Sequence, residues 1–85
     1  MRIERTERFK RNFQALPEAI QRRAEKQLVR FLQNPRHPSL RIKKMRGPQD
    51  IWEGRITQSY RFTFQIREET CILRRIGTHE ILVTP

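Results

Sequence analysis

The chain has 85 residues and a hydrophobic content of 35%, the size and composition of a single small domain over residues 1–85. No apolar stretch approaches the length of a membrane span, which excludes a membrane-spanning helix. Lysine and arginine number 19 against 9 acidic residues, and the net charge of +10 predicts a polyanionic partner such as nucleic acid, the ribosome or an acidic protein.

The cysteine content and the N-terminal segment bear on the compartment. Cys71 is the only cysteine, so no disulfide forms within the chain and a reducing compartment suits it. The N-terminal "MRIERTERFKRNF" has no apolar run of the kind that a secretory signal requires. We therefore expect a cytoplasmic protein that does not associate with a membrane.

The N-terminal third predicts a short strand followed by two helices. "MRIERT" places charged residues on both sides of an isoleucine, as in an edge strand. Thr6 is a suitable N-cap for a helix over 7–16, in which apolar residues recur at helical spacing. Pro17 suits the start of a second helix over 18–33, which has one apolar stripe and ends before an Asn-Pro pair.

The rest of the chain changes to the period-two pattern of strands. A basic connector, expected to be extended over 40–43, leads to three segments rich in β-branched and aromatic residues: 51–56, 60–66 and 71–77. The intervening "TQS" and "REET" have lengths that suit hairpin turns. These segments predict an antiparallel meander.

The fold class follows from the alternation within 60–66. Tyr60, Phe62, Phe64 and Ile66 share one face of this strand, and polar residues share the other. Two amphipathic helices bury such an aromatic face. The predicted fold is α+β, a β-α-α-β-β-β two-layer sandwich in which an αα-hairpin covers one face of a mainly antiparallel sheet.

The opposite face of the sheet carries the candidate chemistry. Strand parity places Glu53, Arg55 and Arg61 there, and Arg75 shares parity with His79 along the last strand. The connector contributes four further cations, Arg41, Lys43, Lys44 and Arg46. Together these residues predict a concave basic surface that holds a carboxylate, an imidazole and several guanidinium groups.

Such a set of groups suits cleavage of RNA by its own 2′-hydroxyl. One group removes the 2′ proton, another protonates the 5′ leaving oxygen, and fixed cations stabilise the charge of the phosphorane. Histidine suits the proton transfers because the ordinary pKa of an imidazole lies near neutrality. Simpler interpretations stay open: His79 as a surface residue and Glu53 as the ion-pair partner of Arg55 or Arg61. Spacing alone supports a basic binding module more firmly than an enzyme.

The sequence predicts neither a metal site nor a cofactor. His37, Cys71 and His79 do not provide the four ligands at paired spacing that structural zinc requires. No glycine-rich phosphate loop, HExxH motif or nucleophile elbow occurs.

Three segments, "IWEGRIT", "SYRFTF" and "IGTHEIL", carry a family resemblance. With the order of the predicted elements, they resemble the RelE/ParE superfamily of toxins from bacterial type II toxin–antitoxin systems. The final "GTH" is similar to that of the YafQ-like and YoeB-like ribonuclease branches. The resemblance implies a metal-independent, ribosome-dependent mRNA endoribonuclease that leaves a cyclic phosphate and inhibits translation.

The resemblance also implies roles for individual residues. Arg61 falls on the family's arginine that stabilises the phosphate and transition state, and His79 on its general acid. A basic pair of some RelE proteins falls on Trp52 and Gly54, so this chain departs from that pattern and Glu53 becomes the candidate base. The residues expected to hold RNA are Arg41, Lys43, Lys44, Arg46, Arg55 and Arg75.

The implied partners are mRNA, the ribosome and a cognate acidic antitoxin that covers the basic groove. Two other functions stay open at this point. One is a ParE-like inhibitor of DNA gyrase without nuclease activity, and the other is a basic RNA-binding domain without catalysis.

Overall fold

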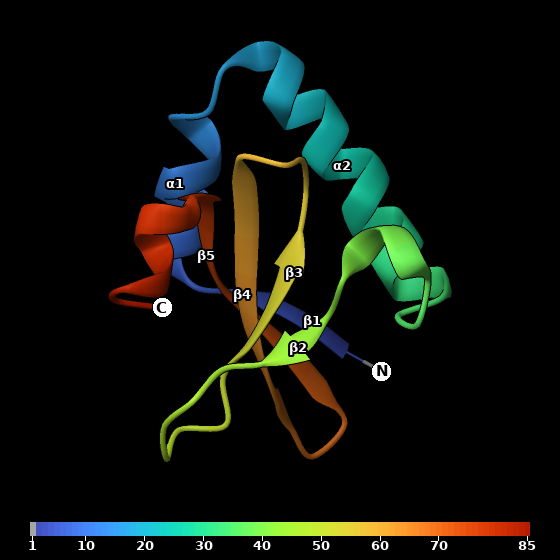
Figure 1. Ribbon diagram of the computed structural model, residues 1–85, viewed down its shortest axis with the longest axis vertical. Coiled ribbons are helices and arrows are strands. Elements are labelled where there is room, and N and C mark those ends of the chain that lie inside the picture. Colours follow the sequence, from blue (N-terminus) through green and yellow to red (C-terminus); the bar gives the residue numbers. More distant parts are fainter. Residues whose placement is uncertain (1) are drawn as a thin grey trace.

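The computed structural model describes residues 2–85, in which two helices accompany a five-stranded mixed sheet (Figure 1). The elements are β1 (Arg2–Arg5), α1 (Glu7–Gln14), α2 (Glu18–Gln33), the 3₁₀ helix η1 (Pro38–Leu40), β2 (Lys43–Lys44), β3 (Trp52–Arg55), β4 (Tyr60–Arg67), β5 (Thr70–Thr78) and the 3₁₀ helix η2 (His79–Leu82). The strand order is β1-β5-β4-β3-β2, with β1 parallel to β5 and the other pairs antiparallel. None of the helices in residues 2–85 is both long and apolar enough to cross a membrane.

The predicted α+β fold is confirmed, with small differences at the ends of elements. The second helix has the predicted bounds, whereas the first ends at Gln14 instead of Leu16. The connector was expected to be extended over 40–43, but a 3₁₀ turn continues through Leu40 and the strand is β2. Met1, which belonged to the predicted first strand, lies outside the described residues.

Two side chains fix the helices relative to the sheet and to each other. The Thr6 hydroxyl accepts a hydrogen bond from the Phe9 N–H at 3.0 Å and donates one to the Arg74 carbonyl at 2.8 Å. The first bond satisfies an N–H group at the start of α1, and the second ties α1 to β5. Gln21 Nε2 donates to the Phe13 carbonyl at 3.0 Å, which joins the end of α1 to α2.

Aromatic side chains of α2 and β4 form the centre of the core. Phe31 lies edge-on to Phe62, with the ring centroids 5.3 Å apart, and 4.8 Å from the ring of Phe64. Phe62 pairs across the sheet with Gly54, where a Cβ would collide with Cε1 and Cζ of the Phe62 ring and lie 2.8 Å from Ile42 Cδ1. The missing side chain at residue 54 therefore allows Phe62 to pack on β3.

A β-bulge interrupts the alternation of β5. The neighbouring β4 residues Thr63 and Phe64 pair with Arg75 and Leu73, so Arg74 has no partner of its own on β4. Buried apolar residues of β5 are accordingly odd-numbered before the bulge and even-numbered after it. The bulge thus changes which side chains of β5 reach each face.

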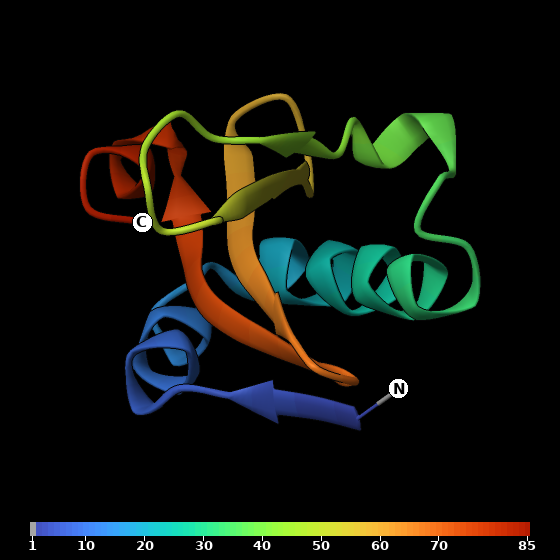
Figure 2. The ribbon, with the colours of Figure 1, turned by 90° about the horizontal axis from the view of Figure 1, so that it is seen from below.

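The sheet face turned away from the core was expected to be open, but its centre is buried. Thr63 is completely buried, and Gln65 and Glu53 are only 6% and 8% exposed. The loop between β2 and β3 covers part of this face, since Gln65 Nε2 donates to the Gln49 carbonyl at 2.7 Å. In addition, η2 contacts β4 and β5, and Figure 2 shows it with the C-terminus on the side of the molecule away from α2. The expected broad surface is thereby narrowed to a smaller pocket.

We expect Gly54→Ala to destabilise the fold by about 1–3 kcal/mol, because its methyl group would collide with the buried Phe62 ring. Urea unfolding followed by the fluorescence of Trp52 measures this change. Phe62→Leu removes the ring atoms concerned, so it should reduce the cost of Gly54→Ala in a double-mutant cycle. Additive effects of the two substitutions would contradict the proposed contact.

Candidate active site

One pocket, with a volume of about 350 Å³, lies where β2, β3 and β4 meet η2. Its lining residues are Arg41, Lys43, Glu53, Arg55, Arg61, His79 and Leu82. All of these except Leu82 were grouped by the sequence as candidate site residues. The fold thus brings an imidazole, a carboxylate and four cations to one small space; their roles in catalysis stay predictions.

The register of the sheet places two guanidinium groups side by side. Arg55 of β3 pairs with Arg61 of β4, which in turn pairs with Gly77 of β5. Desolvation lowers the pKa of Arg55 from its usual range, the charges of Arg61 and Arg41 lower it further, and Glu53 acts in the opposite direction. These like charges repel one another, so an anion bound between them would relieve the repulsion.

Glu53 is the carboxylate of this pocket. It lies opposite Lys43 in the pairing of β3 with β2, and its Oε1 is 3.8 Å from Lys43 Nζ. The Glu53 side chain is 10% exposed and that of Lys43 is 69% exposed. The acid is therefore held in the wall of the pocket, while the amine extends into solvent.

Arg61 is held in place by the hairpin turn between β3 and β4. Its Nη1 donates to the carbonyls of Thr57, Gln58 and Tyr60 at 2.7, 2.7 and 3.2 Å. The turn is itself ordered, because Thr57 Oγ1 accepts from the N–H groups of Ser59 and Tyr60, both at 3.2 Å. Within residues 2–85, no hydrogen bond uses Nε or Nη2 of Arg61. One edge of the guanidinium is thus anchored by neutral groups, and the other edge keeps its donors for a ligand.

His79 reaches the pocket as the first residue of η2. Its side chain is exposed, whereas Ile81 of the same turn is buried and anchors η2 on the sheet. This close approach depends on Gly77, since a Cβ there would lie 2.9 Å from Ile81 Cγ2. The glycine of "GTH" therefore allows η2 to fold back and carry the histidine to the pocket.

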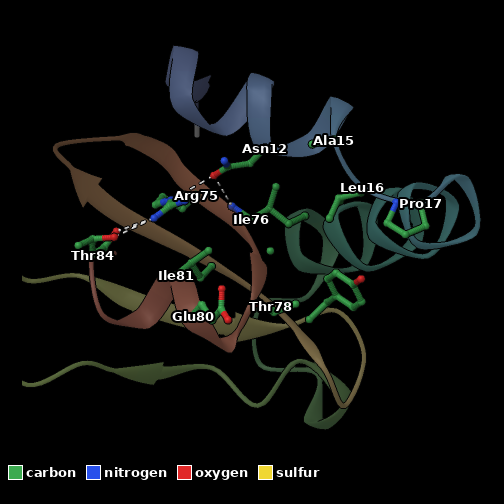
Figure 3. A pocket seen from close by; sticks show the side chains of 12 residues that line it. Asn12, Ala15, Leu16, Pro17, Arg75, Ile76, Thr78, Glu80, Ile81 and Thr84 are labelled. Atoms are coloured by element: carbon green, nitrogen blue, oxygen red, sulfur yellow. Dashed lines mark hydrogen bonds between the residues drawn. The ribbon is translucent and has the colours of Figure 1, made fainter.

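Arg75, predicted to hold RNA beside His79, does not line this pocket. Its Nε donates to Asn12 Oδ1 at 3.1 Å, and its Nη1 donates to Thr84 Oγ1 at 2.9 Å and to the Thr84 carbonyl at 3.2 Å (Figure 3). Arg75 and its two partners, Asn12 and Thr84, line a different pocket, which lies between α1 and the C-terminal segment. Arg75 does lie on the face that parity predicted, because it pairs with Thr63 as Gly77 pairs with Arg61. The hydrogen bonds to Asn12 and Thr84 hold its guanidinium away from the pocket of His79. Arg75 connects α1 to the segment that follows η2.

Two further predicted RNA-binding residues also lie outside the pocket. Lys44 pairs with Asp50, with Nζ 2.8 Å from Oδ1, and this contact lowers the pKa of the Asp50 carboxyl. Arg46 is exposed in the loop between β2 and β3. Trp52 and Gly54, on which a basic pair of the family was expected to fall, share the face of Phe64 and Phe62. A basic side chain at position 52 or 54 would point toward the core and would not reach the pocket. A basic side chain at position 53 or 55 would reach it.

Two features of the pocket were not predictable from the sequence: the backbone carbonyls that anchor Arg61 and the presence of Leu82. Carbonyl acceptors in a turn have no residue signature, and Leu82 carries none of the charged or proton-transfer groups by which the other pocket residues were recognised. Across residues 2–85, no three His, Cys, Asp or Glu side chains come close enough together to hold a metal ion.

We expect Gly77→Ala to displace η2, because the added Cβ would press on Ile81 Cγ2. The ring resonances of His79 should shift in NMR spectra, and His79→Ala identifies them against those of His37. Leucine has no Cγ2 methyl, so Gly77→Ala/Ile81→Leu should restore the wild-type resonances. An unchanged His79 spectrum in Gly77→Ala would show that η2 is positioned by other contacts.

Comparison with known proteins identifies the fold. No protein-family model and no curated protein matches the sequence. Among solved structures, a YoeB/ParE toxin from Agrobacterium tumefaciens is similar, with a TM-score of 0.76 and 14% identity over 93% of this chain and 99% of the other. A chain of the intact E. coli RelBE toxin–antitoxin complex gives 0.70 and 24% over 91% and 94%. YafQ from E. coli gives 0.70 and 16% over 96% and 98%.

These identities are low, and the likeness is one of fold. The shared fold extends over nearly the whole chain, since each match covers more than nine-tenths of it. The chain has the RelE/ParE-like fold that RelE, YoeB and YafQ toxins share.

Proposed function

We propose that this chain is the toxin of a type II toxin–antitoxin system and cleaves mRNA on the ribosome without a metal ion. The observation that carries the proposal is the pocket that His79, Glu53 and Arg61 share. It combines two proton-transfer groups with anchored cations, which is the set that cleavage by a 2′-hydroxyl needs. The shared fold with RelE, YoeB and YafQ toxins supports the same assignment.

The proposed reaction is an in-line displacement at phosphorus. The 2′-hydroxyl oxygen attacks the adjacent phosphate while Glu53 accepts its proton. The bond from phosphorus to the 5′ oxygen breaks, and His79 donates a proton to that leaving oxygen. The products are a 2′,3′-cyclic phosphate and a 5′-hydroxyl, so protons and electrons balance without a co-reactant.

The charge that develops on the phosphorane is stabilised by Arg61 and Arg55. Nη1 of Arg61 is occupied by turn carbonyls, so the guanidinium is already oriented when substrate arrives. Donors fixed in this way cost little reorganisation during the reaction. The remaining Nε and Nη2 form a fork that matches two phosphate oxygens. Arg41 and Lys43, at the rim of the pocket, bind the flanking RNA.

A cognate acidic antitoxin is the proposed protein partner, and the ribosome is the proposed site of action in the cytoplasm. The net charge of +10 favours association with both an acidic protein and ribosomal RNA. Two of the structures that share this fold, from E. coli and Methanococcus jannaschii, are toxin–antitoxin complexes. Antitoxin binding over the basic pocket would block access of RNA to His79 and Arg61.

His79→Ala and Arg61→Ala should each lower message cleavage by about 100-fold or more, because they remove the general acid and a charge-stabilising donor. Primer extension on a message in a translating extract measures the cleavage. Arg11→Ala is the control, since this exposed arginine of α1 lines neither the pocket nor its rim.

Three results would contradict the catalytic residues or the nuclease activity itself. Full cleavage by both variants would show that the catalytic residues lie elsewhere. Intact messages together with inhibition of DNA gyrase by the wild type would favour the ParE-like alternative. Salt-sensitive RNA binding without cleavage would favour a binding domain.

A sulfur substitution separates the acid from the base. In an RNA whose scissile 5′ oxygen is replaced by sulfur, the thiolate leaves without protonation. His79→Ala should therefore recover most of its activity on this substrate, whereas Glu53→Gln should stay impaired because the 2′ proton must still be removed. Single-turnover cleavage rates measure both effects. Recovery by Glu53→Gln and not by His79→Ala would reverse the two roles.

A further inference from the structure

A second basic pocket, with a volume of about 470 Å³, lies between α2 and the end of β3. We name it the α2 pocket, and the lining residues used below are Arg23, Lys26, Gln27, Arg30, Ser39 and Arg55. Within the described part of the chain, no carboxylate lines it. Four cations therefore surround a hollow of the size that admits a phosphate group and its sugar.

The floor of the α2 pocket is a hydrogen-bonded network. Gln27 is 8% exposed, and its Nε2 donates to the Arg55 carbonyl at 2.9 Å. Gln27 Oε1 in turn accepts from Arg30 Nη1 at 2.9 Å, and Ser39 Oγ accepts from the same nitrogen at 3.1 Å. Ser39 Oγ also lies 2.9 Å from His37 Nδ1. This network fixes the guanidinium of Arg30 through neutral groups.

The cations of the α2 pocket keep their charge for a ligand. Across residues 2–85, Arg23, Lys26, Arg30 and Arg55 belong to none of the ion pairs, whereas Arg22 on the same helix lies 3.3 Å from Glu18. Nε and Nη2 of Arg30 make no hydrogen bond within this part of the chain. The arrangement repeats that of Arg61: one anchored nitrogen and an open fork.

The α2 pocket adjoins the candidate active-site pocket, the one lined by His79, Glu53 and Arg61. Arg55 lines both pockets. The hairpin turn also links them, because Thr57 and Gln58 line the α2 pocket and their carbonyls anchor Arg61. A strand whose scissile phosphate lies at Arg61 can therefore pass over Arg55 toward Arg30.

We propose that the α2 pocket binds a second phosphate of the RNA strand whose scissile phosphate occupies the active-site pocket. The inference rests on the proposed function, since it extends that substrate along the surface. Anchored arginine forks match phosphate oxygens, and a charged groove that follows the backbone is how proteins hold single strands without reading sequence.

An acidic protein segment fits the α2 pocket less well. Protein interfaces are centred on buried apolar anchors, and among residues 2–85 Ile56 is the sole apolar residue that lines this pocket. The exposed apolar residues of α2, Val29 and Leu32, lie in another groove with Phe9 and Phe13 of α1. The surface that suits a protein is thus separate from the surface that suits a phosphate chain.

The test uses fluorescent 2′-O-methyl RNA of about four and about 12 nucleotides, which 2′-hydroxyl attack cannot cleave. Fluorescence anisotropy over a salt series gives the Kd and its salt dependence. Arg23→Gln/Lys26→Gln should weaken binding of the longer RNA roughly 10-fold and make the log–log salt slope shallower by about 1.4, for two lost phosphate contacts. The advantage of the longer over the shorter RNA should shrink accordingly.

Two matched variants separate a built site from general attraction. Arg11→Gln/Arg67→Gln removes the same charge from exposed positions outside both pockets and should change Kd by about twofold at most. Arg30→Lys keeps the charge but loses the anchored fork, so it should still weaken binding of the longer RNA. Wild-type affinity in Arg30→Lys, or equal losses in both double variants, would overturn the inference.

The remaining outcomes distinguish this inference from the proposed nuclease. If the wild type cleaves messages but the α2-pocket variants bind RNA as well as the control pair does, only the second phosphate site is overturned. The expected binding losses without any message cleavage support the second site and overturn the nuclease. If Arg23→Gln/Lys26→Gln retains its affinity for RNA but loses affinity for a polyglutamate peptide, the α2 pocket would be assigned to an acidic protein instead.

Discussion

The packing of Phe62 over Gly54 is the constraint on which the candidate site depends. It fixes β3 against β4, and it directs the aromatic residues of β4 toward the core. Because side chains alternate along a strand, the same register turns Glu53, Arg55 and Arg61 to the opposite face. A slip of one residue would place guanidinium groups in the core and phenyl rings in the pocket. The aromatic core therefore positions the polar groups that line the pocket.

The way in which arginines are anchored determines the electrostatics of both pockets. Arg61 is held by turn carbonyls and Arg30 by an amide and a hydroxyl. A carboxylate would have fixed these guanidiniums equally well, but it would also have neutralised them. Lys44 shows the contrasting case, since Asp50 lies 2.8 Å from it. Neutral anchors keep the arginines both ordered and charged, which is what binding of a phosphate chain requires.

The fold was largely predictable because its signals are local. The apolar stripe of α2 and the alternation of 60–66 each lie within one element, and both elements formed as expected. Grouping His79 with Arg61 also succeeded, since η2 returns the histidine to the face that parity had assigned to it. Arg75 lies on the predicted face but outside this pocket, because hydrogen bonds to Asn12 and Thr84 hold its side chain. No residue pattern marks such contacts between distant segments.

By itself the sequence determined the α+β class, the excess of positive charge and the residue types suited to proton transfer and phosphate binding. These properties depend on residue identity and on periodicity over a few neighbours. Only the tertiary structure decided which cations share a pocket with His79, which are paired elsewhere, and that a second basic pocket adjoins the first through Arg55. The physical reason is that these outcomes arise from contacts between distant segments, such as Gln27 with β3 and η2 with β4, which no local pattern encodes.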